Sequence, residues 1–447
     1  MARGLANRAA VEKAVEKVMR KQPVVDMHTH LYPPSFGTPD PNATGKVDSK
    51  GLLLWGLDEL LTYHYLVAEV FRVSPPRVGK GKGLTYAEFW NLPKAAQADH
   101  IWKHLFIDRT PVSEACRGVL TCLQLLGLDT GKKELPKLRK WFSQQDPDTY
   151  IDRVMELANV ESITMTNPVF DENERERWLK NPAALRGDSR FTAVLRIDPI
   201  LRNWPLAAKK LTEWGFDAGN GKKLTPKNIE EGQRFLREWL DRQTAIYMAL
   251  SLPPEFRFPA GNDAVEQAGQ TALEKIILPV ARERAMPFAM MIGSRLGVNP
   301  ALRDAGDMGG LSDVQSVVHL CAQFPENKFF VTMLARENQH ELCVAARKFG
   351  NLMVFGCWWF LNNPSLIEEM TRMRLELLGT SMIPQHSDSR VLDQLMYKWT
   401  HSRQIIGKVL VDKYADVAAT GWTVTEEDVK RDVERMLKGN FLEFLKR

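Results

Sequence analysis

The sequence lacks several features that would place it in a specialised class of protein. No stretch approaches the ~20 consecutive apolar residues that a membrane-spanning helix requires. The 5 cysteines are widely spaced and include no Cys-x-x-Cys pair, which argues against a zinc ribbon and a disulfide framework. The 60 basic and 55 acidic residues leave a net charge of +5, a weak asymmetry that predicts no nucleic-acid and no membrane partner. The N-terminal segment carries charges throughout and lacks the apolar core of a signal peptide, so we expect a cytoplasmic protein.

What the sequence does contain is an alternation of short apolar runs with longer helical patterns. Eight runs are typical of strands, and each is followed by a helical pattern. These units predict an α/β fold of the (β/α)8 TIM-barrel type. No glycine-rich fingerprint follows the first strand, which argues against the alternative, a doubly wound open sheet. The expected strands cover residues 24–28, 162–165, 191–195, 245–250, 288–292, 329–333, 352–355 and 382–386.

The chain divides into three parts on this reading. Residues 1–22 form an amphipathic helix that Pro23 ends, and residues 23–415 form the barrel. The gap between the first two strands is too long for one strand–helix unit, so residues 32–160 are predicted to be an all-helical insertion. Such an insertion would rise from the C-terminal face of the barrel, where loops build active sites. Residues 416–447 are expected to form a C-terminal helical extension.

The sharpest local pattern is His28-Thr29-His30 at the end of the first strand. Alternate residues of a strand point to the same side, so two imidazoles could bind one divalent metal ion there. Asp388 follows the last expected strand and would lie beside the first one after barrel closure, which suggests a His-His-Asp ligand set. Asp388 could instead cap the next helix, and His386 could be a further ligand or an acid/base group.

Further segments resemble the uronate isomerase (glucuronate isomerase) family of the amidohydrolase superfamily. They are spread over roughly residues 22–415, so the insertion is included. The Trp-Trp-Phe and Asp-Ser-Arg sequences are the most specific, whereas His-x-His is common. The matching segments are the stretch 54–65 that ends in His64-Tyr65, Phe71-Arg72, the Phe-Gly-Cys-Trp-Trp-Phe sequence at 355–360, Ser-Asp-Ser-Arg at 387–390, and 400–403.

The resemblance implies specific roles for these residues. His28, His30 and Asp388 would hold one divalent metal ion, zinc in the first place and manganese as an alternative. Arg390 and Arg196 would bind the sugar carboxylate, for which a guanidinium offers a two-pronged fit, with Arg295 nearby. His64 and Tyr65 would reach the substrate from the insertion, while Trp358 and Trp359 would either pack in the core or form a pocket wall.

The sequence departs from the family pattern at three places. Tyr247–Leu252 supplies no carboxylate after strand four, and the expected strand-five histidine is replaced by methionine at Met290-Met291. Thr166-Asn167 stands where the family has Asp-Asp after strand two.

The resemblance implies an enzyme that interconverts an aldose sugar acid of the D-glucuronate or D-galacturonate type and its ketose, as a divergent member of the family. The acid/base group could be Asp388, Tyr65, His64 or a hydroxide on the metal. The alternatives are a metal-dependent hydrolase of the same superfamily that acts on an anionic substrate, and a non-catalytic sugar-acid or metal-binding protein. The partner would be a small sugar acid, and assembly into homo-oligomers stays open.

Overall fold

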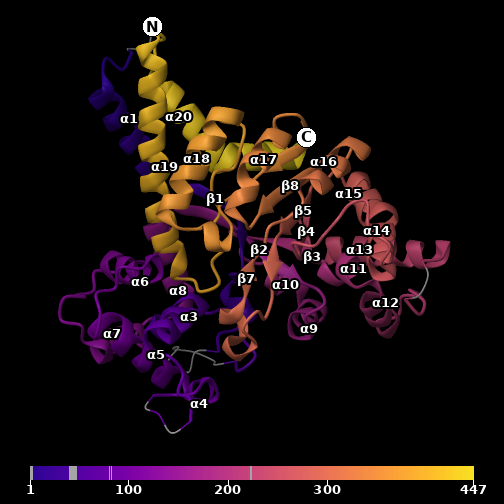
Figure 1. Cartoon of the computed structure of the whole chain (residues 1–447), viewed down its shortest axis with the longest axis horizontal. Coiled ribbons are helices and arrows are strands. Elements are labelled where there is room, and N and C mark those ends of the chain that lie inside the picture. The colour runs from indigo at the N-terminus through magenta and orange to yellow at the C-terminus, as the bar shows by residue number, and fades with distance from the viewer. Residues whose placement is uncertain (1–3, 40–47, 80, 82, 222–223) are drawn as a thin grey trace.

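A parallel sheet forms the centre of the computed structural model, which describes all residues except 1–3, 40–47, 80, 82 and 222–223. Seven strands are hydrogen-bonded in the order β1-β2-β3-β4-β5-β8-β9 (Figure 1). β5 and β8 are buried at every residue, as in parallel sheets that are covered on both faces. The strands are β1 (Val24–Thr29), β2 (Val160–Pro168), β3 (Phe191–Arg196), β4 (Met248–Leu252), β5 (Phe288–Ile292), β8 (Phe329–Met333) and β9 (Leu352–Val354).

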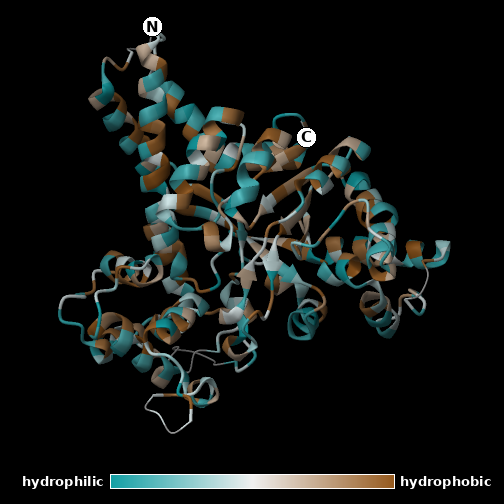
Figure 2. Ribbon diagram, viewed as in Figure 1, coloured by the Kyte–Doolittle hydropathy of each residue, from teal (hydrophilic) through white to brown (hydrophobic). Residues whose placement is uncertain are grey.

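Helices follow the strands and cover the outer face of the sheet, which confirms the predicted barrel class. Figure 2 shows these helices with hydrophobic residues on one side and hydrophilic residues on the other. Residues 364–378 form one continuous helix, α18, whereas residues 264–283 form α14 and α15, which are joined by a π-helical turn. The main covering helices are α9 (Glu172–Lys180), α12 (Trp204–Glu213), α13 (Pro226–Gln243), α14 (Ala264–Ala272), α15 (Leu278–Glu283), α16 (Val314–Gln323), α17 (Gln339–Ala346), α18 (Pro364–Leu378) and α19 (Gln394–Ala419).

The prediction of a regular eighth strand at 382–386 is wrong. This segment is irregular and makes a single bridge, from Ile383 to Phe355. It nevertheless closes the barrel, because the Gly356 amide donates to Ile383 O at 2.8 Å on one side. On the other side, the Asp388 amide donates to His28 O at 3.1 Å and the His30 amide donates to Ser389 O at 2.7 Å. Pro384 lacks the N–H that a ladder needs, and Asp388 has a φ of 50°, so the segment cannot continue as a strand.

The barrel interior is closed from its N-terminal end by the last helix of the chain. Phe441 and Phe444 of α21 (Asn440–Lys446) are buried in one hydrophobic cluster with Met27, Tyr247 and Phe330, whose side chains come from the strands or their ends. The C-terminal extension therefore completes the barrel core. The predicted boundary between residues 415 and 416 lies inside α19.

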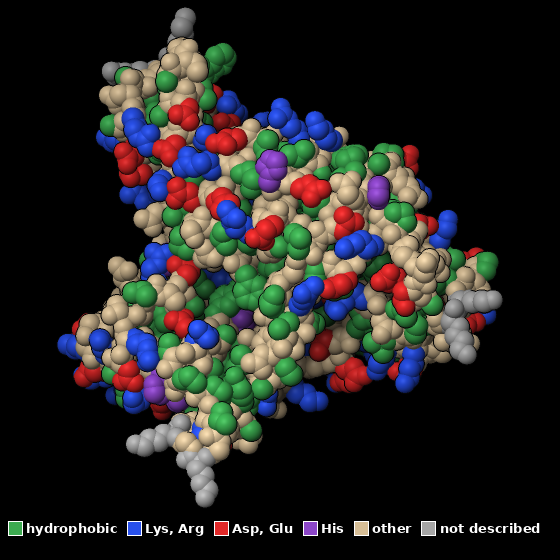
Figure 3. Space-filling view, viewed as in Figure 1, with side chains coloured by type: hydrophobic (Ala, Val, Ile, Leu, Met, Phe, Trp, Pro, Cys, Tyr) green, Lys and Arg blue, Asp and Glu red, His purple; other side chains and the backbone are tan. Residues whose placement is uncertain are grey.

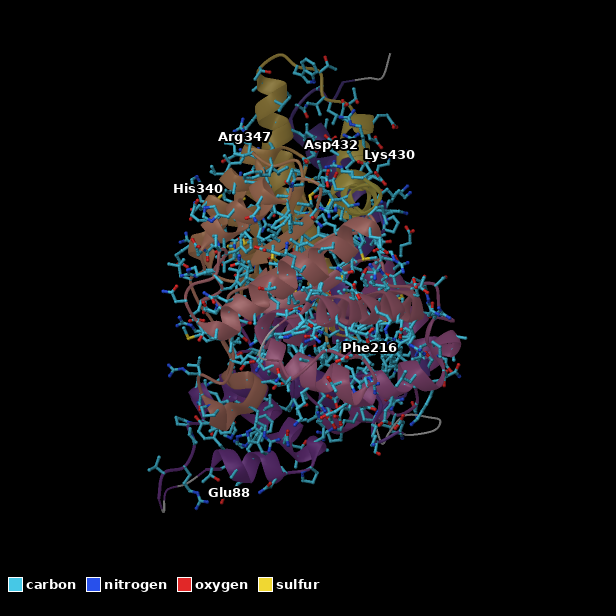
Figure 4. The ribbon with its side chains drawn as sticks, turned by 90° about the vertical axis from the view of Figure 1, so that its right-hand side faces the viewer. Glu88, Phe216, His340, Arg347, Lys430 and Asp432 are labelled. Atoms are coloured by element: carbon cyan, nitrogen blue, oxygen red, sulfur yellow. The ribbon has the colours of Figure 1, made fainter. Side chains whose placement is uncertain are left out.

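Helices fill the connection between β1 and β2, as predicted for the insertion (Figure 1). Residues 57–73 form two helices, because the chain turns at Thr62-Tyr63. Glu88, labelled in Figure 4, lies at the end of the molecule opposite to Asp432. The insertion contains α2 (Leu57–Leu61), α3 (His64–Val73), α4 (Tyr86–Asn91), α5 (Lys94–Trp102), α6 (Glu114–Leu125), α7 (Leu135–Phe142) and α8 (Pro147–Ala158).

A two-stranded hairpin after β5 links the barrel to the insertion. It consists of β6 (Ser294–Arg295) and β7 (Met308–Gly309), which are antiparallel, with a 3₁₀ segment between them. Trp90 of α4 donates its Nε1–H to Ala301 O at 2.9 Å. The Arg303 guanidinium lies 4.6 Å from the centre of the Trp90 ring. The hairpin therefore bridges the two parts of the molecule above the strand ends.

The predicted N-terminal helix is α1 (Arg8–Lys21), and residues 1–3 of the predicted range lie outside the described residues. It packs along α19 and α20 (Glu426–Glu434) in a projection that stands away from the insertion (Figure 1). Acidic and basic side chains are interspersed over the face in Figure 3, in keeping with the small net charge. Among the described residues, none of the helices combines the length and apolar character needed to cross a membrane.

Candidate metal centre and substrate cavity

The two histidines of the His-x-His pattern meet Asp388 at the carboxyl end of β1. His28 Nε2 and His30 Nε2 each lie 3.4 Å from Asp388 Oδ1. The three potential ligand atoms all lie within 4.8 Å of one another. This is the arrangement predicted from the sequence, and it forms because the barrel-closing segment bonds to the backbone of β1.

The state of these side chains fits a divalent cation. His28 Nε2 and Asp388 Oδ1 are buried and have no hydrogen-bond partner among the described residues, which is costly unless another ligand satisfies them. Burial lowers the pKa of His30 to about 4, so its imidazole is neutral. Burial alone would raise the pKa of Asp388, but the two imidazoles beside it hold the pKa well below its usual value. Two imidazoles and one carboxylate are a metal-binding set.

The orientation of His28 is fixed from behind by Thr166 of β2. The Thr166 hydroxyl donates to Thr29 O at 2.9 Å, so its oxygen accepts from His28 Nδ1–H at 3.3 Å. The proton on Nδ1 leaves the lone pair of Nε2 free toward Asp388. Such partners set the tautomer of metal-binding histidines in general. Thr166 thus has a place in the site, although the family pattern has an acidic residue at its position.

The metal centre opens into a cavity of about 130 Å³ at the carboxyl ends of the strands. Barrel enzymes carry their active sites at this face. Side chains reach the cavity from strand ends, from the insertion, from the hairpin β6–β7 and from the segment after β9. They are His28, His30, Tyr63, His64, Arg196, Arg202, Ser251, Met291, Ser294, Leu296, Asp307, Trp358, Trp359, Asp388 and Arg390.

The arginines predicted to bind substrate do not all face this cavity. Arg196 lines it and is held by Asp198 at 2.7 and 2.9 Å. Arg390 also lines it and forms an ion pair with Asp304 of the hairpin at 3.2 Å. Arg295 forms an ion pair with Glu255 at 2.8 Å and is not among the lining residues.

Arg202, the last residue of α11 (Asp198–Arg202), is a lining arginine that sequence reasoning missed. Tyr63, Ser251 and Asp307 were missed as well. Arg202 lies one helical turn after Asp198, and its closeness in sequence to Arg196 and Asp198 could have identified it.

The insertion meets the loop after β9 through aromatic side chains. Trp359 donates its Nε1–H to His64 Nε2 at 3.1 Å, and the Tyr65 hydroxyl donates to Trp359 O at 3.3 Å. Because His64 Nε2 accepts this bond, the ring proton of His64 is on Nδ1. Burial lowers the pKa of His64 to about 3, so the ring is neutral. Both Trp358 and Trp359 line the cavity, and Trp358 also packs in the barrel interior.

His386 lies behind the metal centre. Its ring meets that of His28 edge-on at 5.2 Å, and it is fully buried. It is not part of the group formed by the three potential ligands. Asn167 likewise points away from the cavity, because its amide donates to buried Glu174 at 2.7 Å.

Comparisons with known proteins find solved isomerases that this chain resembles along almost its whole length. The chain is similar to a solved uronate isomerase from Bacillus halodurans, with 49% identity, a TM-score of 0.90, and coverage of 99% of this chain and 97% of that one. A uronate isomerase from Thermotoga maritima is 14% identical, with a TM-score of 0.71 and 97% coverage of both chains. A glucuronate isomerase from Caulobacter crescentus is 15% identical, with a TM-score of 0.62, and covers 100% of this chain and 95% of its own. The two more distant structures show the fold alone. Neither a family model nor a curated protein matches.

Proposed function

Because this chain belongs to the uronate isomerase family, we propose that it interconverts an aldose sugar acid of the D-glucuronate or D-galacturonate type and the corresponding ketose. The observation that carries the proposal is a single cavity that combines the His28–His30–Asp388 set with arginine side chains. The His28–His30–Asp388 set can hold a metal for the carbonyl end of the substrate, and the arginines can bind the carboxylate of the substrate. A hydrolase of an anionic substrate could use the same pairing, so the 49% identity to a solved uronate isomerase is what favours the isomerase.

His28, His30 and Asp388 would hold one divalent metal ion, zinc in the first place and manganese as the alternative. When bound, the ion would stabilise negative charge on the oxygens of C1 and C2 without needing a proton of its own. Side chains of the protein would transfer the proton and bind the substrate.

The five cysteines are free and buried, which supports a reducing, cytoplasmic location.

Asp388 is the residue that we assign to proton transfer from C2 to C1. Its carboxylate is ionised at neutral pH, and C1 and C2 are adjacent, so one group can serve both carbons. Tyr65 is less suited, because burial raises its pKa well above the usual value and its hydroxyl donates to Trp359 O. His64 already accepts from Trp359 at Nε2, so we assign it the role of a neutral hydrogen-bond donor through Nδ1.

Arg390, Arg196 and Arg202 would position the carboxylate of the substrate. Arg196 shares its charge with Asp198 at 2.7 Å, whereas the Asp304 that pairs with Arg390 is exposed on the hairpin. A substrate carboxylate can therefore displace Asp304 from Arg390 at little cost.

Arg390→Lys is expected to raise KM for the sugar acid by about 10-fold or more, because one ammonium cannot replace two parallel charge-assisted bonds.

Asp304→Asn is expected to lower KM by about 2- to 5-fold, because it frees Arg390 from a weak surface ion pair. Steady-state kinetics and metal analysis check both, and metal content should not change. Equal KM values in the native protein and Arg390→Lys would contradict the role of Arg390.

The direct test is turnover of D-glucuronate and D-galacturonate by metal-loaded protein in deuterated water, followed by NMR. Ketose with deuterium at C1 is expected if the proton exchanges with solvent, and unlabelled ketose if Asp388 carries it without exchange. No conversion of either sugar acid by protein that holds one metal ion per chain would rule out the proposed function.

A further inference from the structure

Asp388 is held in a backbone conformation that it does not prefer. Its φ is 50°, in the left-handed region, which aspartate adopts only occasionally and glycine adopts routinely. In this backbone position the Asp388 side chain faces His28 and His30 while the amide of the same residue donates to His28 O. Something in the fold must therefore hold it there.

Lys398 of α19 holds this segment through its carbonyl groups. The side chain is buried, and Nζ donates to Ser387 O at 2.6 Å and to Asp388 O at 3.3 Å. The same ammonium lies 5.9 Å from the centre of the Tyr65 ring. A buried ammonium has three N–H donors, and the Ser387 carbonyl, the Asp388 carbonyl and the Tyr65 ring lie around it to interact with them.

Asp26 holds the same segment from the β1 side. It is completely buried and accepts from the Ser387 amide at 3.1 Å. Trp399, the residue after Lys398 on α19, donates its Nε1–H to the other oxygen of Asp26 at 2.8 Å. The Asp26 carboxylate therefore ties together β1, the segment that contains Asp388, and α19.

We propose that Lys398 and Asp26 are positioning residues that fix Asp388 in its left-handed conformation and thereby set the affinity of the site for its metal. Lys398 fixes the carbonyls of Ser387 and Asp388, which lie on either side of the Asp388 Cα, and Asp26 fixes the amide of Ser387. With both present, the Asp388 side chain points at the two imidazoles before a metal arrives, so less ordering accompanies binding. The inference rests on the metal site of the proposed function and does not depend on the identity of the substrate.

The experiment measures the dissociation constant of Zn²⁺ by chelator competition, without any sugar, on the full chain. Lys398→Met and Asp26→Asn are each expected to weaken zinc binding by about 10- to 100-fold, as is usual for partners behind metal ligands. Lys398→Gln, which keeps a donor, should recover part of the loss. The matched control is Lys408→Met on the same helix, whose ammonium pairs with Glu368 at the surface, and it should bind zinc as the native protein does.

Melting temperatures with and without zinc separate positioning from a general loss of stability. If Lys398 and Asp26 position Asp388, zinc should raise the melting temperature of the variants by less than it raises that of the native protein. Zinc affinities within about twofold of the native value, with equal falls in melting temperature for the metal-free and loaded forms, would overturn the proposal. If Lys398→Met does not fold, Asp26→Asn and Lys398→Gln decide by the same measurements. A protein that shows no isomerase activity but loses zinc affinity in these variants would contradict the proposed function and leave this inference standing.

Discussion

Replacement of Asp388 by asparagine is expected to reduce bound metal well below one ion per chain and to abolish most isomerase activity. Asp388 is the carboxylate of the three-residue group, and its Oδ1 lies 3.4 Å from both imidazoles. Loss of a metal that stabilises the transition state by several kcal/mol, at about 1.4 kcal/mol per factor of ten, lowers kcat by on the order of 10³-fold. The assigned proton carrier disappears in the same variant.

Asparagine tests the role of the Asp388 carboxylate more specifically than alanine does. It has the same shape as aspartate, and asparagine tolerates the left-handed conformation that residue 388 adopts. The fold should therefore survive, which circular dichroism would check. The control is Asp307→Asn, which changes another carboxylate of the same cavity and should leave metal content intact. Full metal content in Asp388→Asn, measured by elemental analysis after dialysis, would contradict the assigned ligand set.

The sequence predicted the barrel because its strands have a local signal. β5 and β8 are continuous apolar runs that are buried at every residue, and their predicted bounds agree with the observed ones. The run at 382–386 has a similar local signal, but Pro384 cannot donate to a ladder and the segment forms only a single bridge. Closure there depends on hydrogen bonds to β1 and β9, which join residues far apart in the chain. Such pairing cannot be read from a local pattern.

The candidate site divides in the same way. The ligand set could be predicted because His28 and His30 are two residues apart on a strand and Asp388 follows the closing segment. The substrate side could be predicted less well. Arg295 has the right position along the chain, but Glu255 pairs with it at 2.8 Å and it does not line the cavity. Asp307 enters the cavity on a hairpin whose position depends on its contacts with the insertion.

Gly356→Ala is expected to be the most destabilising single-methyl change near the site. Gly356 follows β9 with a φ of +64°, and a Cβ there would lie 1.6 Å from His386 Nδ1. His386 has little room to move, because it is fully buried between the rings of His28 and Phe355, at 5.2 and 5.3 Å. Overpacking costs about 1–3 kcal/mol and the left-handed backbone about 1–2 kcal/mol more, so the free energy of unfolding should fall by about 2–5 kcal/mol.

The chain offers a matched control that separates these two contributions. Gly127, after α6, has a φ of +77° and nothing within 4 Å of its hypothetical Cβ, so Gly127→Ala should show the backbone cost alone. Urea unfolding measures the free energy of unfolding of the two variants. We attribute the additional loss in Gly356→Ala to crowding against His386. In the double variant Gly356→Ala/His386→Ala the crowding is removed, and the loss should approach that of Gly127→Ala plus the cost of truncating His386. Equal losses in the two single variants would show that His386 can move aside. Since His386 packs against His28, a displaced His386 should disturb the His28 ring, and Gly356→Ala should therefore bind zinc more weakly than Gly127→Ala.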